Sequence, residues 1–340
     1  MSLKDINGKD PEIYICETNR SAGKTTYFSR WLVKRYINHR EKFALEYRYV
    51  YEIDNVADKF FKDIEGLFYP GYVMHSKRDK SGAFHRLYLK TPSGKTGDEC
   101  GYALALNSAD ALKKNSHLLS DTARIFFDEF QSESNHYCDN EIIKFQSIHA
   151  SIARGGGQFV RRVPVIMCSN PVSLLNPYYS ALGISGRLRD DTKFMRGDGW
   201  VLEHGHNEAA ALAQEQSGFM RAFANDSYAS YAVEGTYLND NYAFIDTPIG
   251  KSDYIATLAY NGTYYGVRLY PDAGILYCDT SADKTYPVCI AVTQDAHDVG
   301  TVMARQFRNL ILLMRYYYDK GCFRFRNLET KSCVLTLLSL

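Results

Sequence analysis

Residues 18–26 have the types and the spacing to bind phosphate groups. Gly23-Lys24-Thr25 follows a short apolar run and precedes a segment with helical periodicity. Backbone amides at such a junction converge on a phosphate, the lysine adds positive charge, and the hydroxyl is a ligand for Mg²⁺. We therefore predict a phosphate-binding loop (Walker A) for ATP, formed by Thr18, Asn19, Arg20, Ser21, Ala22, Gly23, Lys24, Thr25 and Thr26. Thr18 stands where this motif usually has its first glycine, so a surface turn that merely contains Gly-Lys-Thr is the alternative.

An acidic pair, Asp128-Glu129, ends the apolar run at residues 125–127. A magnesium site beside a phosphate loop needs a carboxylate at the end of a neighbouring strand, and an attacking water needs an acceptor beside it. We predict that Thr25 and Asp128 belong to the Mg²⁺ shell (Walker B), and that Glu129 orients and deprotonates the water. Lys24 and Glu129 are thus predicted catalytic residues. The alternative is an ordinary strand that ends in a solvated acidic turn.

Two further polar positions are candidates because of where they lie in the pattern. Ser169 and Asn170 end another apolar run, where an amide side chain can contact the γ-phosphate and report its hydrolysis. A strand-terminating asparagine in a turn is the equally simple alternative. Arg154 precedes three glycines, and a cation in such a loop can act as a catalytic arginine finger on a neighbouring subunit. Most arginines, however, are solvated surface residues.

The first half of the chain must supply the strands and helices that position these residues. Short apolar runs at 12–16, 43–47, 125–127 and 165–168 predict strands, and residues 25–39 carry apolar side chains at helical spacing. Alternating strands and helices favour an α/β fold with a mostly parallel sheet covered on both faces. The long gap between Lys24 and Asp128 leaves room for an added strand. That is the arrangement of P-loop ATPases with a catalytic glutamate.

The pattern changes after about residue 188. We interpret residues 190–226 as a linker or lid containing a helix over 207–219. Apolar runs at 254–260, 264–270 and 275–278, separated by turn residues, then predict an antiparallel meander. The predicted domains are therefore an ATPase domain at 1–189, the linker at 190–226 and a small α+β domain at 227–340.

A late helix is predicted to have one apolar and one basic face. The apolar face carries Met303, Phe307, Leu310, Met314 and Tyr317. The basic stripe comprises Arg305, Arg308, Arg315 and Lys320, with Arg324 and Arg326 beyond it. Such a stripe can contact the phosphates of DNA or RNA, and a solvated helix face is the alternative.

Composition bounds the class of protein. With 340 residues, 45% of them hydrophobic, the chain is large enough for two domains. The N-terminus lacks the features of a secretory signal and no segment has the apolar length to span a bilayer, so we expect a soluble protein that stays where it is made, without a membrane partner. The eight cysteines lack the spacing of a zinc or redox motif, and the net charge of +1 does not decide whether nucleic acid binds.

Several stretches together resemble the genome-packaging ATPases, or DNA encapsidation proteins, of small short-tailed phages whose DNA ends carry a covalent terminal protein; these are similar to large terminase subunits. The matching stretches are Arg20-Ser21-Ala22-Gly23-Lys24-Thr25, Phe126-Phe127-Asp128-Glu129-Phe130, Ser169-Asn170 with Asn176-Pro177-Tyr178, Tyr260-Asn261-Gly262 and Ile275-Leu276-Tyr277-Cys278-Asp279-Thr280. They span nearly the whole chain.

The resemblance implies a ring, of five subunits, docked on the portal vertex of a prohead in the host cytoplasm and driving double-stranded DNA inward. It implies a structural prohead RNA as a further partner. Arg20 would sense nucleotide, Arg154 would act in trans, and Lys113 or Lys114 would lie near an intersubunit contact. The C-terminal domain would resemble a vestigial RNase H-type nuclease that has lost its catalytic acids.

Other functions stay open on the sequence alone. A ring helicase or another nucleic-acid translocase would require single-stranded DNA. A terminase with an active nuclease would use carboxylates of the C-terminal domain, for which the candidates are Asp246, Asp253, Asp272, Asp279 and Asp295. A non-enzymatic scaffold is disfavoured, because a site that only binds nucleotide has no need of the base Glu129.

Overall fold

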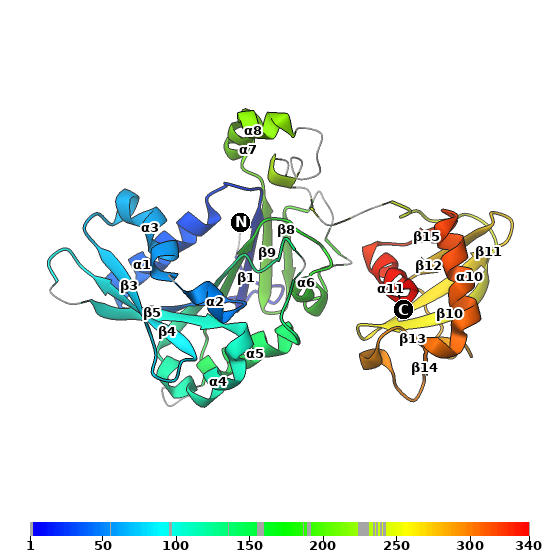
Figure 1. Ribbon diagram of the computed structural model, residues 1–340, viewed down its shortest axis with the longest axis horizontal. Helices are drawn as coiled ribbons and strands as arrows, with labels where there is room; N and C mark the ends of the chain where they lie inside the picture. The colour runs from blue at the N-terminus through cyan, green and yellow to red at the C-terminus, as the bar shows by residue number, and fades with distance from the viewer. Residues whose placement is uncertain are drawn as a thin grey trace. The chain divides into compact units, whose positions relative to one another are not determined.

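The computed structural model divides the chain into two compact units (Figure 1). The first comprises Met1–Leu182 and Leu188–Asn239, and the second comprises Gly183–Arg187 and Asp240–Leu340. The residues that the structure describes are 3–54, 56–94, 97–134, 136–154, 160–185, 187–188, 192–223, 231–233, 235, 237–238, 240 and 243–339.

A nine-stranded sheet forms the centre of the first unit, with the strand order β3-β4-β5-β2-β6-β7-β1-β9-β8. The strands are β1 (Ile13–Thr18), β2 (Lys42–Tyr47), β3 (Val73–Arg78), β4 (Phe84–Lys90), β5 (Asp98–Ala105), β6 (Thr122–Asp128), β7 (Val165–Ser169), β8 (Phe194–Gly197) and β9 (Trp200–Gly205). The run from β5 to β9 is parallel, and β3, β4 and β8 pair antiparallel at the two edges.

The position of β7 matters most for the site. It pairs with β6 on one side and with β1 on the other, so one strand separates the phosphate loop from the acidic pair. An added strand therefore lies between the two motifs, but it is β7, which follows Asp128 in the sequence; the gap between Lys24 and Asp128 instead holds β2, β3, β4 and β5. Because parallel strands end at the same edge of the sheet, residues that follow β1, β6 and β7 gather there.

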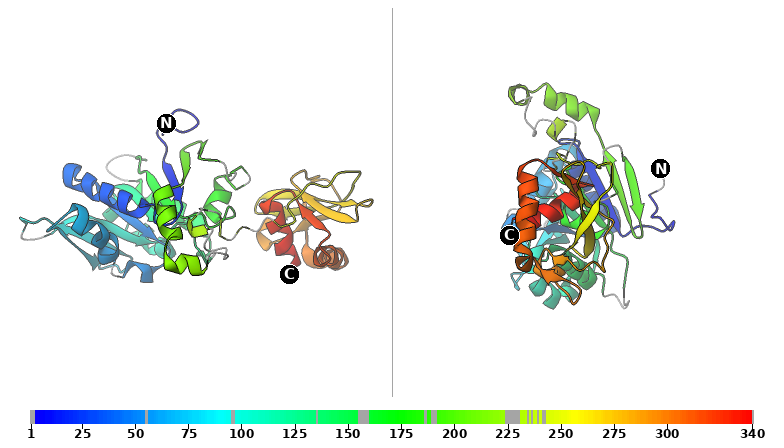
Figure 2. Two further views of the ribbon diagram at one scale, coloured as in Figure 1. Left: turned by 90° about the horizontal axis from the view of Figure 1, so that it is seen from above. Right: turned by 90° about the vertical axis from the view of Figure 1, so that its right-hand side faces the viewer.

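Helices cover both faces of this sheet (Figures 1 and 2). They are α1 (Lys24–His39), α2 (Val50–Ile53), α3 (Val56–Phe68), α4 (Ala109–Lys114), α5 (Glu141–Ile152), α6 (Pro177–Ala181), α7 (Glu208–Glu215) and α8 (Gly218–Ala222), with short 3-10 turns at Leu106–Ser108 and Ser116–Leu119. Leu32 of α1 and Ile64 of α3 share a core with Leu45 of β2. On the other face, Phe145 of α5 packs against Phe127, with ring centroids 6.4 Å apart.

The predicted strands and the first helix are confirmed, whereas the linker prediction needs correction. Residues 194–205 form β8 and β9, and β9 pairs with β1 inside the main sheet. The predicted helix at 207–219 is two helices, because the Ser217 hydroxyl accepts a hydrogen bond from the amide of Met220 and thereby starts a new helix.

The second unit contains a six-stranded sheet with the order β14-β13-β10-β11-β12-β15. Its strands are β10 (Asp253–Tyr260), β11 (Thr263–Tyr270), β12 (Ile275–Asp279), β13 (Cys289–Ala291), β14 (Val302–Met303) and β15 (Phe323–Phe325). The helices α10 (Arg308–Asp319) and α11 (Leu328–Leu338) lie along one face of it (Figure 2), and 3-10 turns occur at Gln294–Ala296 and Ala304–Phe307. The predicted meander is confirmed as β10, β11 and β12.

The predicted basic and apolar faces also need correction at their start. The helix begins at Arg308, while Met303 lies in β14 and Arg305 in a 3-10 turn. Met314 is fully buried against the sheet, as the periodicity predicted. Within the described part of the chain, no helix combines the length and apolar character needed to cross a membrane.

Candidate functional site

The phosphate loop joins β1 to α1, and its backbone explains the missing first glycine. Thr18 is the last residue of β1 and is extended, so a side chain is tolerated there. The left-handed positions are Ser21, with φ 62°, and Gly23, with φ 86°. Gly23 is the N-cap of α1 and offers no side-chain cap, which leaves the first amides of the helix available for an anion.

One pocket gathers almost all the predicted nucleotide residues. It is lined by Arg20, Ser21, Ala22, Gly23, Lys24, Thr25, Thr26, Asp128, Glu129, Ser169 and Asn170. These residues come from the three strand ends at β1, β6 and β7. The predicted residues from the three motifs thus line one pocket, while their roles stay a prediction.

The ammonium group of Lys24 lies among oxygen atoms of the loop and of the neighbouring strand end. Its Nζ donates to Asn170 Oδ1 at 2.8 Å and to Thr18 Oγ1 at 3.0 Å. Burial lowers the pKa of Lys24 from its ordinary value. A phosphate group offers the same ammonium group stronger, charged acceptors. The Lys24–Asn170 contact also connects the phosphate loop to the end of β7.

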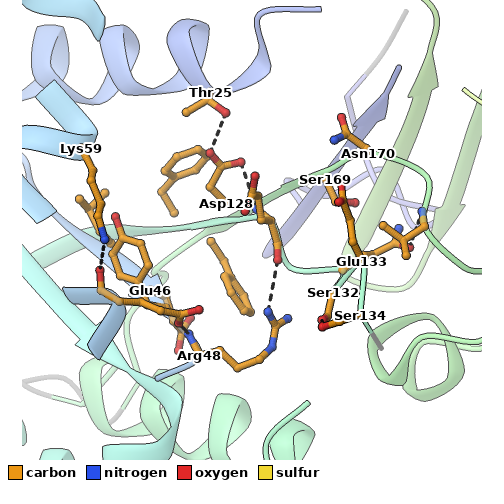
Figure 3. Close-up of a pocket in the computed structure, with 18 of the residues that line it drawn as sticks. Thr25, Glu46, Arg48, Lys59, Asp128, Ser132, Glu133, Ser134, Ser169 and Asn170 are labelled. Atoms are coloured by element: carbon orange, nitrogen blue, oxygen red, sulfur yellow. Dashed lines mark hydrogen bonds between the residues drawn. The ribbon is translucent and has the colours of Figure 1, made fainter. Parts of the chain in front are cut away.

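Asp128 and Thr25 face each other across the pocket (Figure 3). Thr25 Oγ1 donates to Asp128 Oδ2 at 2.6 Å, and the amide of Glu129 donates to Asp128 Oδ1 at 3.1 Å. Burial raises the pKa of Asp128 to about 6, and the neighbouring Glu129 adds to the effect. A nearby cation would favour the ionised form of this carboxyl group.

This pair has the chemistry that Mg²⁺ requires. A hydroxyl and a carboxylate oxygen are hard ligands, and Mg²⁺ usually takes one or two carboxylates together with water and substrate phosphates. In the described part of the chain, no group of three or more His, Cys, Asp or Glu side chains could hold a metal. The residues thus fit an ion that nucleotide and water complete, and Thr25 and Asp128 are the ones that would hold it.

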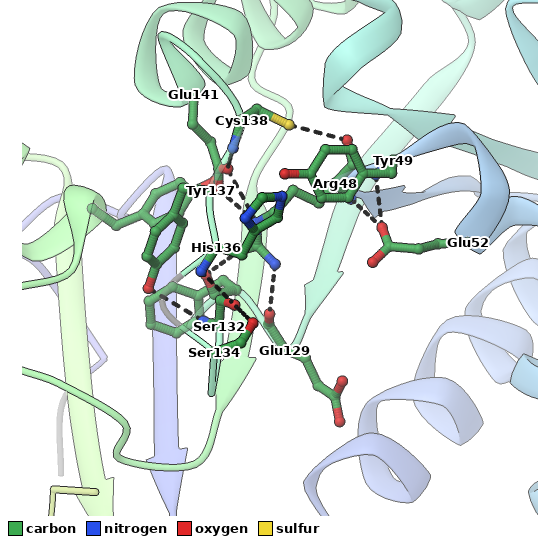
Figure 4. Close-up of polar contacts among 12 residues, drawn as sticks. Arg48, Tyr49, Glu52, Glu129, Ser132, Ser134, His136, Tyr137, Cys138 and Glu141 are labelled. Carbon is green, nitrogen blue, oxygen red and sulfur yellow. Dashed lines mark hydrogen bonds and ion pairs between the residues drawn. The ribbon is translucent and has the colours of Figure 1, made fainter. Parts of the chain in front are cut away.

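Sequence reasoning missed Arg48, which follows β2 and lies behind the acidic pair. Its Nη1 donates to the carbonyl of Glu129 at 3.4 Å, and its Nη2 donates to the carbonyl of Phe130 (Figure 4). Its Nε lies 3.0 Å from both carboxylate oxygens of Glu141. Although burial opposes the charge, Glu141 raises the pKa of Arg48. These partners are far apart in the sequence, so no local motif marks them.

Two buried carboxyl groups near the site were also missed. Glu46 on β2 is 1% exposed and has both side-chain oxygens without a hydrogen-bond partner. Burial, together with Glu141, raises the pKa of Glu46 to about 8. Glu17 on β1 is fully buried, and its Oε2 accepts from His204 Nδ1 and from Tyr237 Oη, each at 2.8 Å.

Gln131 connects the acidic loop to its neighbours. Its amide nitrogen donates to Glu17, and its Oε1 accepts from the amides of Val172 and Ser173 at 3.1 and 2.9 Å. Gln131 therefore connects the loop after β6 to strand β1 and to the loop after β7.

The remaining predicted residues occupy different positions. Arg20 pairs with Glu133 at 3.1 Å at the edge of the pocket. Arg154 is exposed and follows α5 directly, and the three glycines after it lie outside the described residues. Lys113 and Lys114 end α4, and Lys113 lies 3.5 Å from Asp110.

The segment after β9 is fastened to the phosphate loop by Asn19, which is 1% exposed. Asn19 Oδ1 accepts from the amide of Asn207 at 2.8 Å, and Asn19 Nδ2 donates to the carbonyl of Asn207 at 3.1 Å. Gln214 of α7 donates to Ser21 Oγ at 2.8 Å. The segment that contains α7, part of the predicted lid, therefore contacts the phosphate loop at Asn19 and at Ser21.

In the second unit, five of the predicted basic residues are exposed and Arg324 is half-buried. The exposed residues are Arg305, Arg308, Arg315, Lys320 and Arg326. Arg315 donates to the carbonyl of Leu338, Arg324 to that of Gly321 at 2.7 Å, and Arg326 to Thr247 Oγ1 at 3.1 Å, so these three have structural partners.

The candidate acids of the second unit each have a different local setting. Asp279 pairs with Arg268 at 2.9 Å, and Asp246 accepts from the amide of Thr247 at 2.8 Å. Asp253 and Asp272 are exposed at a strand start and in a turn, and Asp295 lies in the 3-10 turn Gln294–Ala296. Over residues 243–339, these side chains form no metal-holding group.

Comparison with known proteins gives consistent matches over the whole chain. The family described as Podovirus DNA encapsidation protein (Gp16) matches residues 5–339. The DNA packaging protein of Bacillus phage phi29 is 23% identical over 312 residues, covering 91% of this chain and 87% of that protein. The DNA packaging protein of Bacillus phage B103 is 24% identical over 311 residues, covering 91% and 88%.

A solved structure matches at the level of the fold. A chain of the bacteriophage Phi-29 viral genome packaging motor assembly superposes with a TM-score of 0.69 at 21% identity, covering 97% of this chain and 94% of that chain. The two chains therefore share their fold along nearly their full length.

Proposed function

The chain belongs to the Podovirus DNA encapsidation protein (Gp16) family, and from this premise we propose that it is a packaging ATPase that couples hydrolysis of Mg-ATP to translocation of double-stranded DNA into a prohead. The observation that carries the proposal is the single pocket at the ends of β1, β6 and β7. It brings a phosphate loop, a magnesium-type pair and a carboxylate base together.

Each residue of the pocket has a role in hydrolysis. Lys24 exchanges its contacts with Thr18 and Asn170 for the β- and γ-phosphates. Glu129 orients the attacking water and accepts its proton, while the amides at the start of α1 hold the phosphates. When bound by Thr25 and Asp128, Mg²⁺ neutralises phosphate charge.

The same contacts offer a route from hydrolysis to movement. Asn170 touches Lys24 and belongs to the loop that Gln131 joins to the acidic pair, so loss of the γ-phosphate alters both strand ends. Arg20, at the pocket edge, senses the nucleotide. Arg154, exposed at the end of α5, serves as the finger for a neighbouring subunit.

Membership of the family supports a proposal for the assembly. The proposed partners are double-stranded viral DNA, the portal of the prohead, a prohead structural RNA and further copies of this chain in a ring of five. The second unit is proposed to be a vestigial RNase H-like domain that contacts nucleic acid. Arg305, Arg308 and Lys320 are exposed cations of this unit, and they support that role more than Arg315 does, because Arg315 donates to the carbonyl of Leu338.

The test is the nucleic-acid dependence of turnover. We expect steady-state ATP hydrolysis by the purified chain to rise with duplex DNA and to respond less to single-stranded DNA of the same sequence, because a packaging motor grips duplex backbone. Stimulation by single-stranded DNA alone would contradict a packaging motor and favour a helicase. Heat-denatured and re-annealed samples of one DNA provide the matched control.

A further inference from the structure

We propose that Tyr178, acting through Glu141 and Arg48, is a positioning residue that fixes the backbone of the catalytic glutamate Glu129. The inference rests on the proposed ATPase function, because it concerns how the base is aimed. It also gives a role to Asn176-Pro177-Tyr178, which the nucleotide pocket does not use.

The short helix α6 places Tyr178 under the acidic loop. Asn176 Oδ1 accepts from the amide of Tyr179 at 2.9 Å and so caps the helix, and Pro177 fits the first helical position. The ring of Tyr178 is packed edge-on against Phe127, Phe130 and Phe145 at centroid distances of 5.5–5.7 Å. The ring can therefore hardly move, and its hydroxyl has a fixed position.

That hydroxyl holds Glu141, the first residue of α5. Tyr178 Oη donates to Glu141 Oε1 at 2.6 Å, and the amide of Cys138 donates to Glu141 Oε2 at 2.7 Å. The carboxylate is 3% exposed, so its geometry is set by these donors and by Arg48 rather than by solvent. Each oxygen has one fixed donor in addition to the shared Arg48 Nε.

Arg48 transmits this geometry to the acidic loop (Figure 4). With Nε held by Glu141, its two terminal nitrogens donate to the consecutive carbonyls of Glu129 and Phe130. A planar guanidinium group anchored on one edge fixes the direction of the other.

The backbone of Glu129 needs such an anchor. Its φ is 52°, a left-handed conformation that costs free energy for a residue with a side chain and persists only when its surroundings hold it. Figure 4 shows the Glu129 carboxylate extending away from Arg48. Arg48 thus holds the backbone carbonyl of Glu129, while the side-chain carboxylate of Glu129 points away from Arg48. A shift of the carbonyl would therefore change the direction of the carboxylate.

We call the hydrogen-bonded series Tyr178, Glu141 and Arg48 the relay. Among the described residues, none of its hydrogen bonds reaches the phosphate loop. Binding of ATP through Lys24 and Thr25 therefore does not depend on it, whereas the chemical step does. A purely structural role of Tyr178 would instead lower stability without separating binding from turnover.

The experiment compares Tyr178→Phe, Glu141→Gln and the double variant with wild type. Tyr178→Phe keeps the packed ring and removes only the hydroxyl. We expect each single variant to lower kcat about tenfold or more, since small misplacements of a catalytic group have effects of this size. The Kd for ATP should stay within about twofold of wild type, because ground-state binding is separate from transition-state contacts. The double variant should lose no more than the worse single variant, because both changes interrupt one relay.

The matched control is Tyr102→Phe. Tyr102 is equally buried, and its hydroxyl lies 2.7 Å from Asp121 Oδ1 and 2.9 Å from Glu99 Oε1, away from the nucleotide pocket, so the kcat of Tyr102→Phe should match wild type. Wild-type kcat in Tyr178→Phe, an equal loss in Tyr102→Phe, or additive losses in the double variant would overturn the inference. Glu129→Gln separates the two claims: if wild type turns over no faster than Glu129→Gln, the proposed function fails.

Discussion

At the scale of single residues, the site holds ionisable groups in surroundings that oppose their charge. Burial lowers the pKa of Lys24 and raises that of Asp128 to about 6. A bound nucleotide with Mg²⁺ supplies charges of both signs, so it relieves both penalties at once. We therefore expect binding of Mg-ATP to offset the free-energy penalty of burying the charged forms of Lys24 and Asp128.

The buried carboxyl group of Glu46 also has a raised pKa, and this gives a prediction. Its pKa is about 8 in the folded chain and 4.5 in a solvated reference, so the folded state holds the proton more tightly. Its contribution to stability is full below pH 4.5 and is lost as the pH rises toward 8. We expect Glu46→Gln to remove this pH dependence and to stabilise the first unit at pH 8.

The measurement is urea unfolding at pH 5 and pH 8, followed by tryptophan fluorescence. Both tryptophans, Trp31 and Trp200, lie in the first unit, so the signal reports that unit alone. The exposed Glu215→Gln provides the control and should keep the wild-type pH dependence. Identical pH dependence in Glu46→Gln and wild type would contradict the buried, protonated state of Glu46.

The sequence identifies the residues with local motifs and misses those without them. Lys24, Asp128 and Asn170 each end or follow an apolar run, and the structure brings them into one pocket. Arg48 contacts Glu129 from 81 positions away and Glu141 from 93 positions away, so only the fold reveals these contacts. Glu46 looks like an ordinary strand residue until its burial is known.

At the scale of elements, the parallel sheet could be predicted because its inner strands are short apolar runs. The central strand β7 is fully buried and reads plainly as a strand. By contrast, β9 ends in Glu203-His204-Gly205, a polar sequence that indicates a loop. It is a strand because it pairs with β1 along six residues, a tertiary contact with no sign in the local sequence.

The contact between the loop and α7 gives a prediction at this scale. Asn19→Ala removes both hydrogen bonds to the backbone of Asn207, so the amide of Asn207 loses its partner while the carbonyl keeps the amide of Ala211. We expect a loss of about 0.5–1.5 kcal/mol in the stability of the first unit, which is the net contribution of a typical hydrogen bond. We also expect weaker ATP binding, because the phosphate loop loses its support.

The matched variant is Asn207→Ala. It removes the side-chain cap on the amide of Ala210 but keeps the backbone groups that Asn19 contacts. It should cost about 1 kcal/mol in stability, as for a lost helix cap, and leave the affinity for ATP unchanged. Urea unfolding and ATP titration of both variants measure this. Equal ATP affinity in the two variants would show that Asn19 does not support the loop.

At the scale of the whole molecule, the residues of the proposed nucleotide site and the cations proposed to contact nucleic acid lie in different units. The first unit contains every residue of the nucleotide pocket, and the second carries exposed cations on and beside α10. The boundary falls after Asn239 rather than after the predicted residue 226, apart from the segment Gly183–Arg187, and the predicted linker at 190–226 belongs to the first unit. Composition alone placed it too early because β8 and β9 follow the change in pattern.

Mixed rings test the action of Arg154 between subunits. Arg154→Ala alone should lose turnover, because each site would lack the finger of its neighbour. Mixing it with Glu129→Gln should restore part of the activity, since that chain still donates its arginine to an intact site. A chain that carries both substitutions, mixed with Glu129→Gln, should show no rescue. Absence of activity in every mixture of the single variants would refute the trans role.

The most direct test of the central claim compares ATP binding and ATP hydrolysis in wild type and Glu129→Gln. We predict that both chains bind ATP with similar affinity, because glutamine keeps the shape and polarity of the side chain. Turnover should fall at least about 100-fold in the variant, since general-base catalysis contributes that much or more. Equal turnover in the two chains would contradict the assignment of Glu129 as the base and, with it, this account of the site.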